Sequence, residues 1–137
     1  MRRRASVIIV ENYSVALIKR MKEKTVYYVF PGGGIEHGET PEDGAKREAL
    51  EELGVEVRIG ECVAKVHYNG TEYYFLAEIM KGNFGTGRGE EYTNKSRNRG
   101  TYLPVWIDLN ECSLINIKPK EVALKVQLLF NRGGGRS

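Results

Sequence analysis

The stretch from Gly33 to Val55 constrains the fold of this chain more than any other part of it. Thr40 can cap a helix, and Pro41 suits the first helical position, where a missing N–H group has no cost. Gly54 is typical of the left-handed residue that ends a helix. The sequence therefore predicts one helix from about Pro41 to Leu53.

Three carboxylates share one side of this predicted helix. At about 100° per residue, Glu48, Glu51 and Glu52 fall within roughly 100° of one another. Such a cluster repels itself unless a positive charge lies among the acids, and its hard oxygen ligands suit Mg²⁺ or Mn²⁺. A different face carries apolar residues and is expected to pack inward: Ala45, Ala49, Leu50 and Leu53.

The alternative interpretation is a solvated acidic helix face, which is the usual role of such residues. Two features favour the site. Arg47 stands among the acids and can pair with Glu39 on the preceding loop. The run Pro31–Gly34 also comes before the helix, where exposed backbone groups and a helix N-terminus can meet an anion or a metal.

Length and composition predict one domain over residues 1–131 and a disordered tail over 132–137. Of the 137 residues, 41% are hydrophobic and 28% charged, and no apolar run approaches the ~20 residues of a membrane span. The formal charge is +3, but setting aside the five arginines near the two ends leaves −2. The body is therefore no basic nucleic-acid footprint. Two cysteines without metal spacing predict a cytoplasmic protein with reduced thiols.

The remaining patterns predict β-strands and a second helix. Asn69-Gly70 is typical of a hairpin turn, and Gly60 of a bend or bulge. The residues from 81 to 100 form a long glycine-rich loop. A helix over residues 119–130 presents a broad apolar face that should pack on the sheet, namely Val122, Leu124, Val126, Leu128 and Leu129. The predicted strands are Ala5–Val10, Ser14–Lys19, Val26–Phe30, Val55–Ile59, Cys62–Tyr68, Glu72–Met80 and Tyr102–Ile107.

The stretch resembles the signature box of the Nudix hydrolases, Gly-x5-Glu-x7-Arg-Glu-U-x-Glu-Glu-x-Gly-U, where U is aliphatic. Every fixed position is met, and only Ala49, at the first U, is smaller than usual. The order of elements also looks like that family's fold. The resemblance implies an α/β/α sandwich with a mixed β-sheet between helices, in which the box forms a loop–helix–loop.

The resemblance also implies roles for the box residues. The family cleaves a nucleoside diphosphate linked to another group by attack of water on phosphorus, usually with Mg²⁺. Glu48 and Glu52 match its main metal ligands, and the carbonyl of Gly32 matches a backbone ligand. Glu51 matches a ligand or a base that acts through water. We count Glu51 and Glu52 as catalytic. Arg47 and Glu39 match a pair that supports the site.

In the family, a further glutamate often comes from a loop outside the box. Here Glu91 is the first candidate and Glu90 the second, while a solvated loop is the alternative. Arg88 and Arg97 in the same loop can clamp phosphates, and Tyr73 can stack on a base or simply pack.

The sequence hypothesis is thus a cytoplasmic, Mg²⁺-dependent pyrophosphohydrolase, with Mn²⁺ as a possible substitute. Its substrate is expected to be a small nucleotide, either a nucleoside triphosphate or a nucleotide sugar. It is expected to act as a monomer or homodimer without membrane or nucleic acid. Two alternatives stay open. One is a non-catalytic nucleotide sensor, although such modules usually lose box glutamates. The other is an RNA 5′-end pyrophosphohydrolase, against which the near-neutral body argues.

Overall fold

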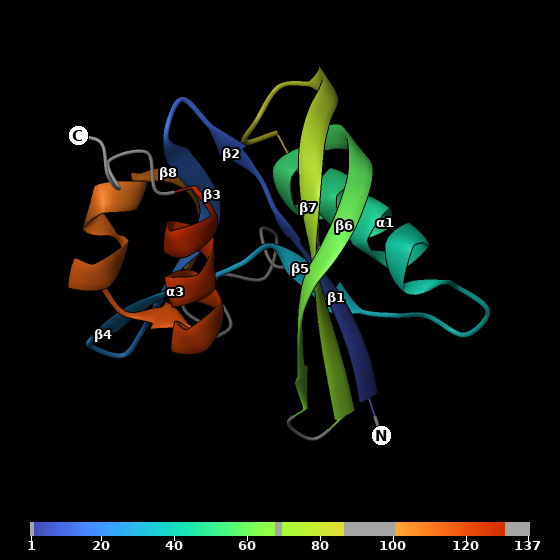
Figure 1. The fold of residues 1–137 in the computed structure, drawn as a ribbon, viewed down its shortest axis with the longest axis horizontal. Coiled ribbons are helices and arrows are strands. Elements are labelled where there is room, and N and C mark those ends of the chain that lie inside the picture. Colours follow the sequence, from blue (N-terminus) through green and yellow to red (C-terminus); the bar gives the residue numbers. More distant parts are fainter. Residues whose placement is uncertain (1, 68–69, 87–100, 131–137) are drawn as a thin grey trace.

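The computed structural model describes residues 2–67, 70–86 and 101–130. Its strands form two sheets flanked by two α-helices (Figure 1), which confirms the predicted α/β/α class. The expected sheet between the helices is divided into two. No helix in the described ranges is both long and apolar enough to cross a membrane.

The first sheet has the strand order β5-β1-β7-β6. Its members are β1 (Arg2–Ile8), β5 (Gly32–Gly34), β6 (Val55–His67) and β7 (Gly70–Gly82). Strand β1 runs parallel to β7 and antiparallel to β5, so the sheet is mixed. Strands β6 and β7 form the predicted hairpin, whose tip at residues 68–69 lies outside the described residues. The pairing shifts register between Ile59 and Cys62, where Gly60 predicted a bulge.

The second sheet is organised around the central strand β3 (Ser14–Lys22). One edge of β3 pairs with β8 (Thr101–Asp108), and the other edge pairs with β2 (Val10–Glu11) and β4 (Thr25–Val29). A short parallel strand, β9 (Ile117–Lys118), extends the sheet beside β4. The chain leaves this sheet at the end of β4 and enters the first sheet at β5, so it carries the glycine run from one sheet to the other.

Two α-helices and a 3-10 segment complete the fold of the described residues: α1 (Pro41–Leu53), η2 (Leu109–Leu114) and α3 (Lys120–Leu129). The bounds of α1 agree with the sequence prediction. Thr40 Oγ1 accepts a hydrogen bond from Asp43 N at 3.0 Å, and Gly54 ends the helix with φ 79°. These contacts satisfy backbone groups that have no partner inside the helix.

Two apolar cores lie on opposite sides of the sheets. The α1-side core joins Ala45, Ala49 and Leu53 of α1 to both sheets, whereas the α3-side core joins α3 and η2 to them. Strand β3 contributes to both because its side chains alternate. Ala16 and Ile18 enter the α1-side core, and Val15 and Leu17 enter the α3-side core.

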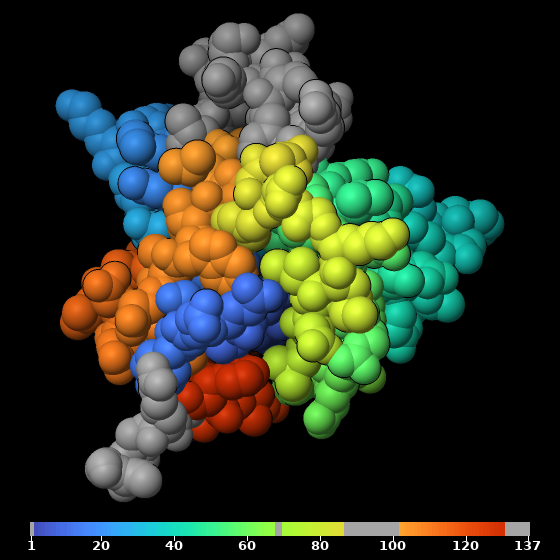
Figure 2. All heavy atoms as spheres, turned by 90° about the horizontal axis from the view of Figure 1, so that it is seen from above, coloured from blue at the N-terminus to red at the C-terminus, as the bar shows by residue number. Residues whose placement is uncertain are grey.

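The turn after β7 connects α1 to β8. Phe84 packs against Trp106, with ring centroids 4.7 Å apart. The backbone N–H groups of Gly85 and Thr86 donate to Leu53 O at 2.8 and 3.2 Å. Figure 2, seen from above, shows the yellow end of β7 between the green helix α1 and the orange segment that includes β8. The turn after β7 therefore contacts both the C-terminal end of α1 and strand β8.

Two apolar predictions were wrong. Leu50 was expected to pack inward, but it is 56% exposed, while its helix neighbours Ala49 and Leu53 are fully buried. In α3, Leu124, Leu128 and Leu129 are 49–75% exposed, and the buried residues are Val122, Ala123 and Val126. Alanine therefore occupies part of the contact face of each helix, and a hydrophobicity pattern weights leucine above alanine.

Candidate active site

The buried acids of α1 lie against the glycine strand β5. Glu48 and Glu52 are one helical turn apart, and only 8% and 6% of their surfaces are exposed. Gly32 N donates a hydrogen bond to Glu52 Oε1 at 3.0 Å. A Cβ atom at position 33 would lie 2.4 Å from Glu48 Oε2, so Gly33 is required for this close approach. Glu51, in contrast, is an exposed residue of the same helix.

The backbone of β5 presents polar groups to this helix. Among the described strands, β5 pairs only with β1. Just before β5, Pro31 O accepts a hydrogen bond from the β1 backbone, and just after it, Ile35 N donates one to that backbone. Antiparallel strands alternate hydrogen-bonded and non-hydrogen-bonded residue pairs. The peptide groups of Gly32 and Gly34 therefore point away from β1. In agreement, Gly34 O accepts a hydrogen bond from Arg47 Nη2 at 2.9 Å.

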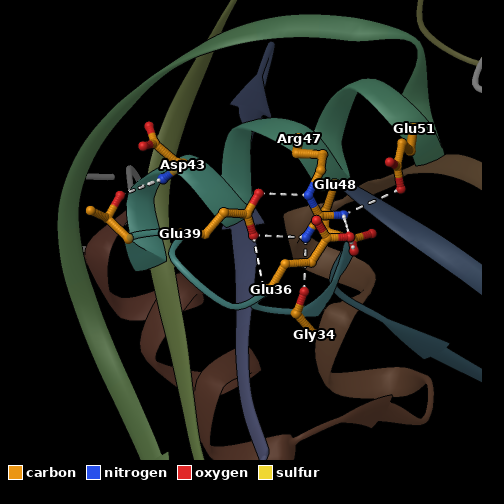
Figure 3. A network of polar contacts seen from close by, with 8 residues as sticks. Gly34, Glu36, Glu39, Asp43, Arg47, Glu48 and Glu51 are labelled. Atoms are coloured by element: carbon orange, nitrogen blue, oxygen red, sulfur yellow. Dashed lines mark hydrogen bonds and ion pairs between the residues drawn. The ribbon is translucent and has the colours of Figure 1, made fainter.

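Arg47 connects the loop, the strand and the helix acids, as Figure 3 shows. Its Nε and Nη2 donate to Glu39 Oε2 and Oε1 at 2.7 and 3.0 Å, which is a bidentate pair. Its Nη1 donates to Glu48 Oε2 at 3.0 Å and to Glu51 Oε1 at 3.5 Å. Glu36 is more distant, with 3.8 Å between its carboxylate and Nη1. The predicted pairing of Arg47 with Glu39 is present in this structure.

The same network shifts the protonation of its members. Hydrogen bonds from Arg47, and then from the backbone N–H of Glu36, lower the pKa of Glu39 from 4.5 to about 2. The hydrogen bond to Glu39 is the main reason that the pKa of Arg47 lies above its ordinary value, and burial opposes this shift. Both groups are therefore charged at neutral pH, and the loop before α1 is held to the helix by a permanent ion pair.

The donor set fits a hard divalent cation in its chemistry. It consists of two buried carboxylates, Glu48 and Glu52, an exposed one, Glu51, and the outward-facing carbonyl of Gly32. Mg²⁺ prefers such oxygen ligands. Within the described ranges, however, no three His, Cys, Asp or Glu side chains converge on one point as metal ligands would. The contacts already given direct Glu48 toward Arg47, and Glu52 toward the Gly32 amide.

A groove of about 630 Å³ opens between the two sheets close to the glycine strand. Arg4 and Glu72 line the wall formed by the first sheet, and Arg4 is paired in register with Gly34. Val29 and Lys118 line the wall formed by the second sheet. The groove has charged groups of both signs, with 3.8 Å between Arg4 Nε and Glu72 Oε2. It therefore offers polar and apolar contacts beside the box.

The contacts of the predicted residue Tyr73 lie apart from this network. Tyr73 is half-buried, and its described ring contacts are with Phe75, at 6.3 Å between centroids, and with Lys65 Nζ at 5.6 Å. Its predicted role in substrate binding therefore finds no support in these contacts. Four predicted residues lie outside the described residues: Arg88, Glu90, Glu91 and Arg97.

Sequence reasoning missed two features. One is the carbonyl of Gly34, which accepts a hydrogen bond from Arg47. The only sequence signal for it is that a third glycine ends the run. The other is Arg20, whose guanidinium carbon lies 3.7 Å from the ring centroid of Tyr102. The alternation of β3 could have placed Arg20 on the same side as Ile18, but its partner strand β8 lies some 80 positions further along the chain.

Solved structures with this fold include several hydrolases. A Nudix hydrolase from Nitrosomonas europaea superposes with a TM-score of 0.72 at 16% identity, over 93% of this chain and 88% of that one. An ADP-ribose pyrophosphatase from Streptococcus suis gives 0.63 at 15% identity, over 92% and 91%. A UDP-X diphosphatase gives 0.67 at 18% identity, over 99% of this chain and 64% of that one. At these identities the similarity establishes the fold.

Sequence comparison identifies the family. A search of curated proteins finds no match. The family model described as the NUDIX domain, however, matches residues 1–124, which is most of the chain and includes the whole box. This match agrees with the fold and with the placement of the box acids against the glycine strand. The chain therefore belongs to the Nudix family and is a hydrolase that acts on phosphoric anhydride bonds.

Proposed function

We propose that this Nudix hydrolase is a Mg²⁺-dependent pyrophosphohydrolase, with Mn²⁺ as a possible substitute, that cleaves the diphosphate linkage of a small nucleoside diphosphate-X substrate. The observation that carries the proposal is the pair of buried carboxylates, Glu48 and Glu52, held beside β5. Two buried acids a helical turn apart are costly without a positive partner. Arg47 supplies part of that charge, and a bound cation would supply more.

In this proposal Glu48, Glu52, Glu51 and the Gly32 carbonyl hold the metal. When bound there, such an ion would supply positive charge to offset that of the diphosphate and would make a nearby water easier to deprotonate. Glu51 is exposed and within reach of solvent, so it is the described box residue best placed to move a proton from the attacking water. Arg47 and Glu39 position the glutamates and take no part in the chemistry. Glu91, or else Glu90, remains our candidate for an additional base.

The groove between the sheets supports a small nucleotide as the substrate, because it lies close to the glycine strand and has both apolar and charged walls. Either a nucleoside triphosphate or a nucleotide sugar fits the reaction class. The UDP-X diphosphatase and the ADP-ribose pyrophosphatase among the structural relatives also act on nucleoside diphosphates linked to a further group. We further propose a cytoplasmic location, which the two free cysteines, Cys62 and Cys112, support.

The rival functions are less well supported. A non-catalytic sensor does not need the full set of box glutamates that this chain retains. An RNA 5′-end pyrophosphohydrolase would need a basic groove, whereas here Glu72 and Glu121 balance Arg4 and Lys118 in the groove lining. Strong, salt-sensitive RNA binding would favour the RNA enzyme.

The first test is hydrolysis with Glu52→Gln. This change removes one ligand charge and keeps the shape of the side chain. We expect kcat to fall by at least about 100-fold at saturating Mg²⁺. Mutation of a residue that only hydrogen-bonds to a metal ligand already lowers metal affinity or activity by about 10–100-fold. The assay compares nucleoside triphosphates, nucleotide sugars, ADP-ribose and triphosphorylated RNA, each with Mg²⁺ and with chelator.

The matched control is Glu56→Gln, an exposed glutamate of β6, which should leave kcat unchanged. Circular dichroism would confirm that both variants are folded. Wild-type turnover by Glu52→Gln would show that the reaction centre lies elsewhere. Tight binding of one nucleotide by the wild type without any hydrolysis would favour the sensor.

A further inference from the structure

The positively charged side chain of Arg20 lies between two aromatic rings on the second sheet. Arg20 of β3 stands directly opposite Tyr27 of β4 and Tyr102 of β8 in the strand registers. The guanidinium carbon lies 3.7 Å from the Tyr102 ring centroid and 5.6 Å from that of Tyr27. At 3.7 Å the guanidinium is in van der Waals contact with the ring. The orientation of the cation is therefore held by stacking.

A second cation shares one of these rings. Lys118 belongs to β9, the strand that pairs with β4. Its Nζ lies 4.6 Å from the ring centroid of Tyr27. Lys118 is exposed, and no carboxylate of the described part of the chain lies within ion-pair distance of it. Two positive charges thus lie against aromatic rings in a group of four side chains. We term this group the cationic row; it consists of Tyr102, Arg20, Tyr27 and Lys118.

The cationic row lies on the same side of the sheet as the catalytic helix. Arg20 follows Ile18 by two residues in β3, and Ile18 belongs to the α1-side core. Tyr27 precedes Gly32 by five residues, so their Cα atoms are at most about 18 Å apart. Lys118 also lines the groove beside the glycine strand. The cationic row is therefore within the reach of a nucleotide held at the box.

We propose that the cationic row binds a phosphate group of the substrate other than the two joined by the cleaved bond. This inference rests on the proposed function and narrows its substrate class to nucleoside triphosphates rather than nucleotide sugars. Arg and Lys donate charge-assisted hydrogen bonds to phosphate oxygens, and a neutral sugar cannot accept bonds of comparable strength. Stacking of a base on Tyr27 is a weaker alternative, because cations already approach this ring from Arg20 and Lys118.

Two pairs of nucleotides test the role of the group that follows the nucleoside diphosphate. UTP and UDP-glucose share the nucleoside diphosphate and differ in whether a phosphate or a neutral sugar follows it, and ATP and ADP-glucose form the second pair. Lys118→Gln should weaken binding of both triphosphates about tenfold, as expected for loss of one charge-assisted hydrogen bond, and should leave both sugar nucleotides unchanged. Calorimetry in the presence of chelator measures these affinities without turnover.

Lys120→Gln is the matched control for charge, because Lys120 is exposed two residues away and does not line this groove. Arg20→Lys keeps the charge but loses the flat stack on Tyr102, so it should also raise KM for a triphosphate more than for its sugar partner. Equal weakening of triphosphate and sugar by Lys118→Gln, or no weakening at all, would overturn the inference.

The two proposals fail in different ways. If the wild type hydrolyses a nucleotide with Mg²⁺ and Glu52→Gln is inactive, the proposed function stands whatever the Lys118 variant does. If the wild type hydrolyses nothing, the proposed function fails, while the binding contrast between UTP and UDP-glucose still decides the role of the cationic row.

Discussion

Arg47 shows how much one side chain can organise. Its planar guanidinium contacts a loop carboxylate through two donors, a strand carbonyl through one of these, and two helix carboxylates through the third nitrogen. Lysine has a single point charge and could not make the bidentate pair with Glu39 while also reaching Gly34. The loop, β5 and α1 are therefore connected through one residue that also contacts Glu48.

The pairing of Glu39 has a consequence for acid stability. Because the pKa of Glu39 is about 2 when folded and 4.5 ordinarily, the pairing stabilises the fold above about pH 4.5. This stabilisation is lost as the pH falls toward 2, since the unfolded chain then binds a proton that the folded chain does not. Glu39→Gln should therefore be less stable than wild type at pH 7, and the difference should shrink toward pH 2.

Urea denaturation at pH 7, 5 and 3 measures this difference. Glu56→Gln serves again as the exposed control, and its difference from wild type should change less over the same range. A stability gap between wild type and Glu39→Gln that stays constant with pH would mean that the ion pair does not contribute to folding.

At the scale of elements, β5 controls the distance between strand and helix. A Cβ at position 33 would lie 2.4–2.8 Å from the carboxylate of Glu48, whereas one at position 34 would meet only the guanidinium of Arg2, at 2.9 Å. The first neighbour is buried and bonded to Arg47, and the second is the end of an exposed flexible side chain. The two glycines therefore differ in what a methyl group would displace.

Gly33→Ala should reduce kcat by displacing Glu48, and Gly34→Ala should retain most of it. Steady-state hydrolysis of the best substrate, together with thermal melting, checks both variants. We expect a rise in the Mg²⁺ concentration needed for half-maximal activity with Gly33→Ala. Equal effects of the two changes would indicate that general backbone stiffening, and not the contact with Glu48, explains the loss.

The sequence predicted some elements well and others not at all. The bounds of α1 followed from Thr40, Pro41 and Gly54, because the signals that start and end a helix are local. Strands β5 and β9 were missed. Three glycines have no β-propensity, and β5 forms only because β1, from the start of the chain, lies beside it. The box acids were found by spacing, but their unequal burial depends on the packing of α1 against the first sheet, which the chain assembles from distant segments.

At the scale of the whole molecule, two cores on opposite sides of the sheets decide which apolar residues matter. Leu109 of η2 is 1% exposed in the α3-side core, whereas Leu128 of α3 is 75% exposed. The sequence could not distinguish such leucines, since the buried face of α3 is set by the second sheet and η2, which the chain assembles from distant segments.

Leu109→Ala should lower the free energy of unfolding by about 2–5 kcal/mol, the usual range for a buried leucine. Leu128→Ala should change it by no more than about 0.5 kcal/mol, as for an ordinary surface site. Chemical denaturation of both variants measures the contrast. A large loss with Leu128→Ala would reveal that this exposed face of α3 is covered in solution, for example by a second copy of the chain.

The outward peptide groups of β5 also bear on how copies of the molecule avoid one another. An open sheet edge is a template for pairing with another chain and so for aggregation. Here the edge strand has only three residues, and the side chains of Glu52 and Arg47 already occupy its outward amide at Gly32 and carbonyl at Gly34. Glu52 and Arg47 therefore also cover part of an open sheet edge, so selection against aggregation and selection for the site proposed above would favour the same two side chains.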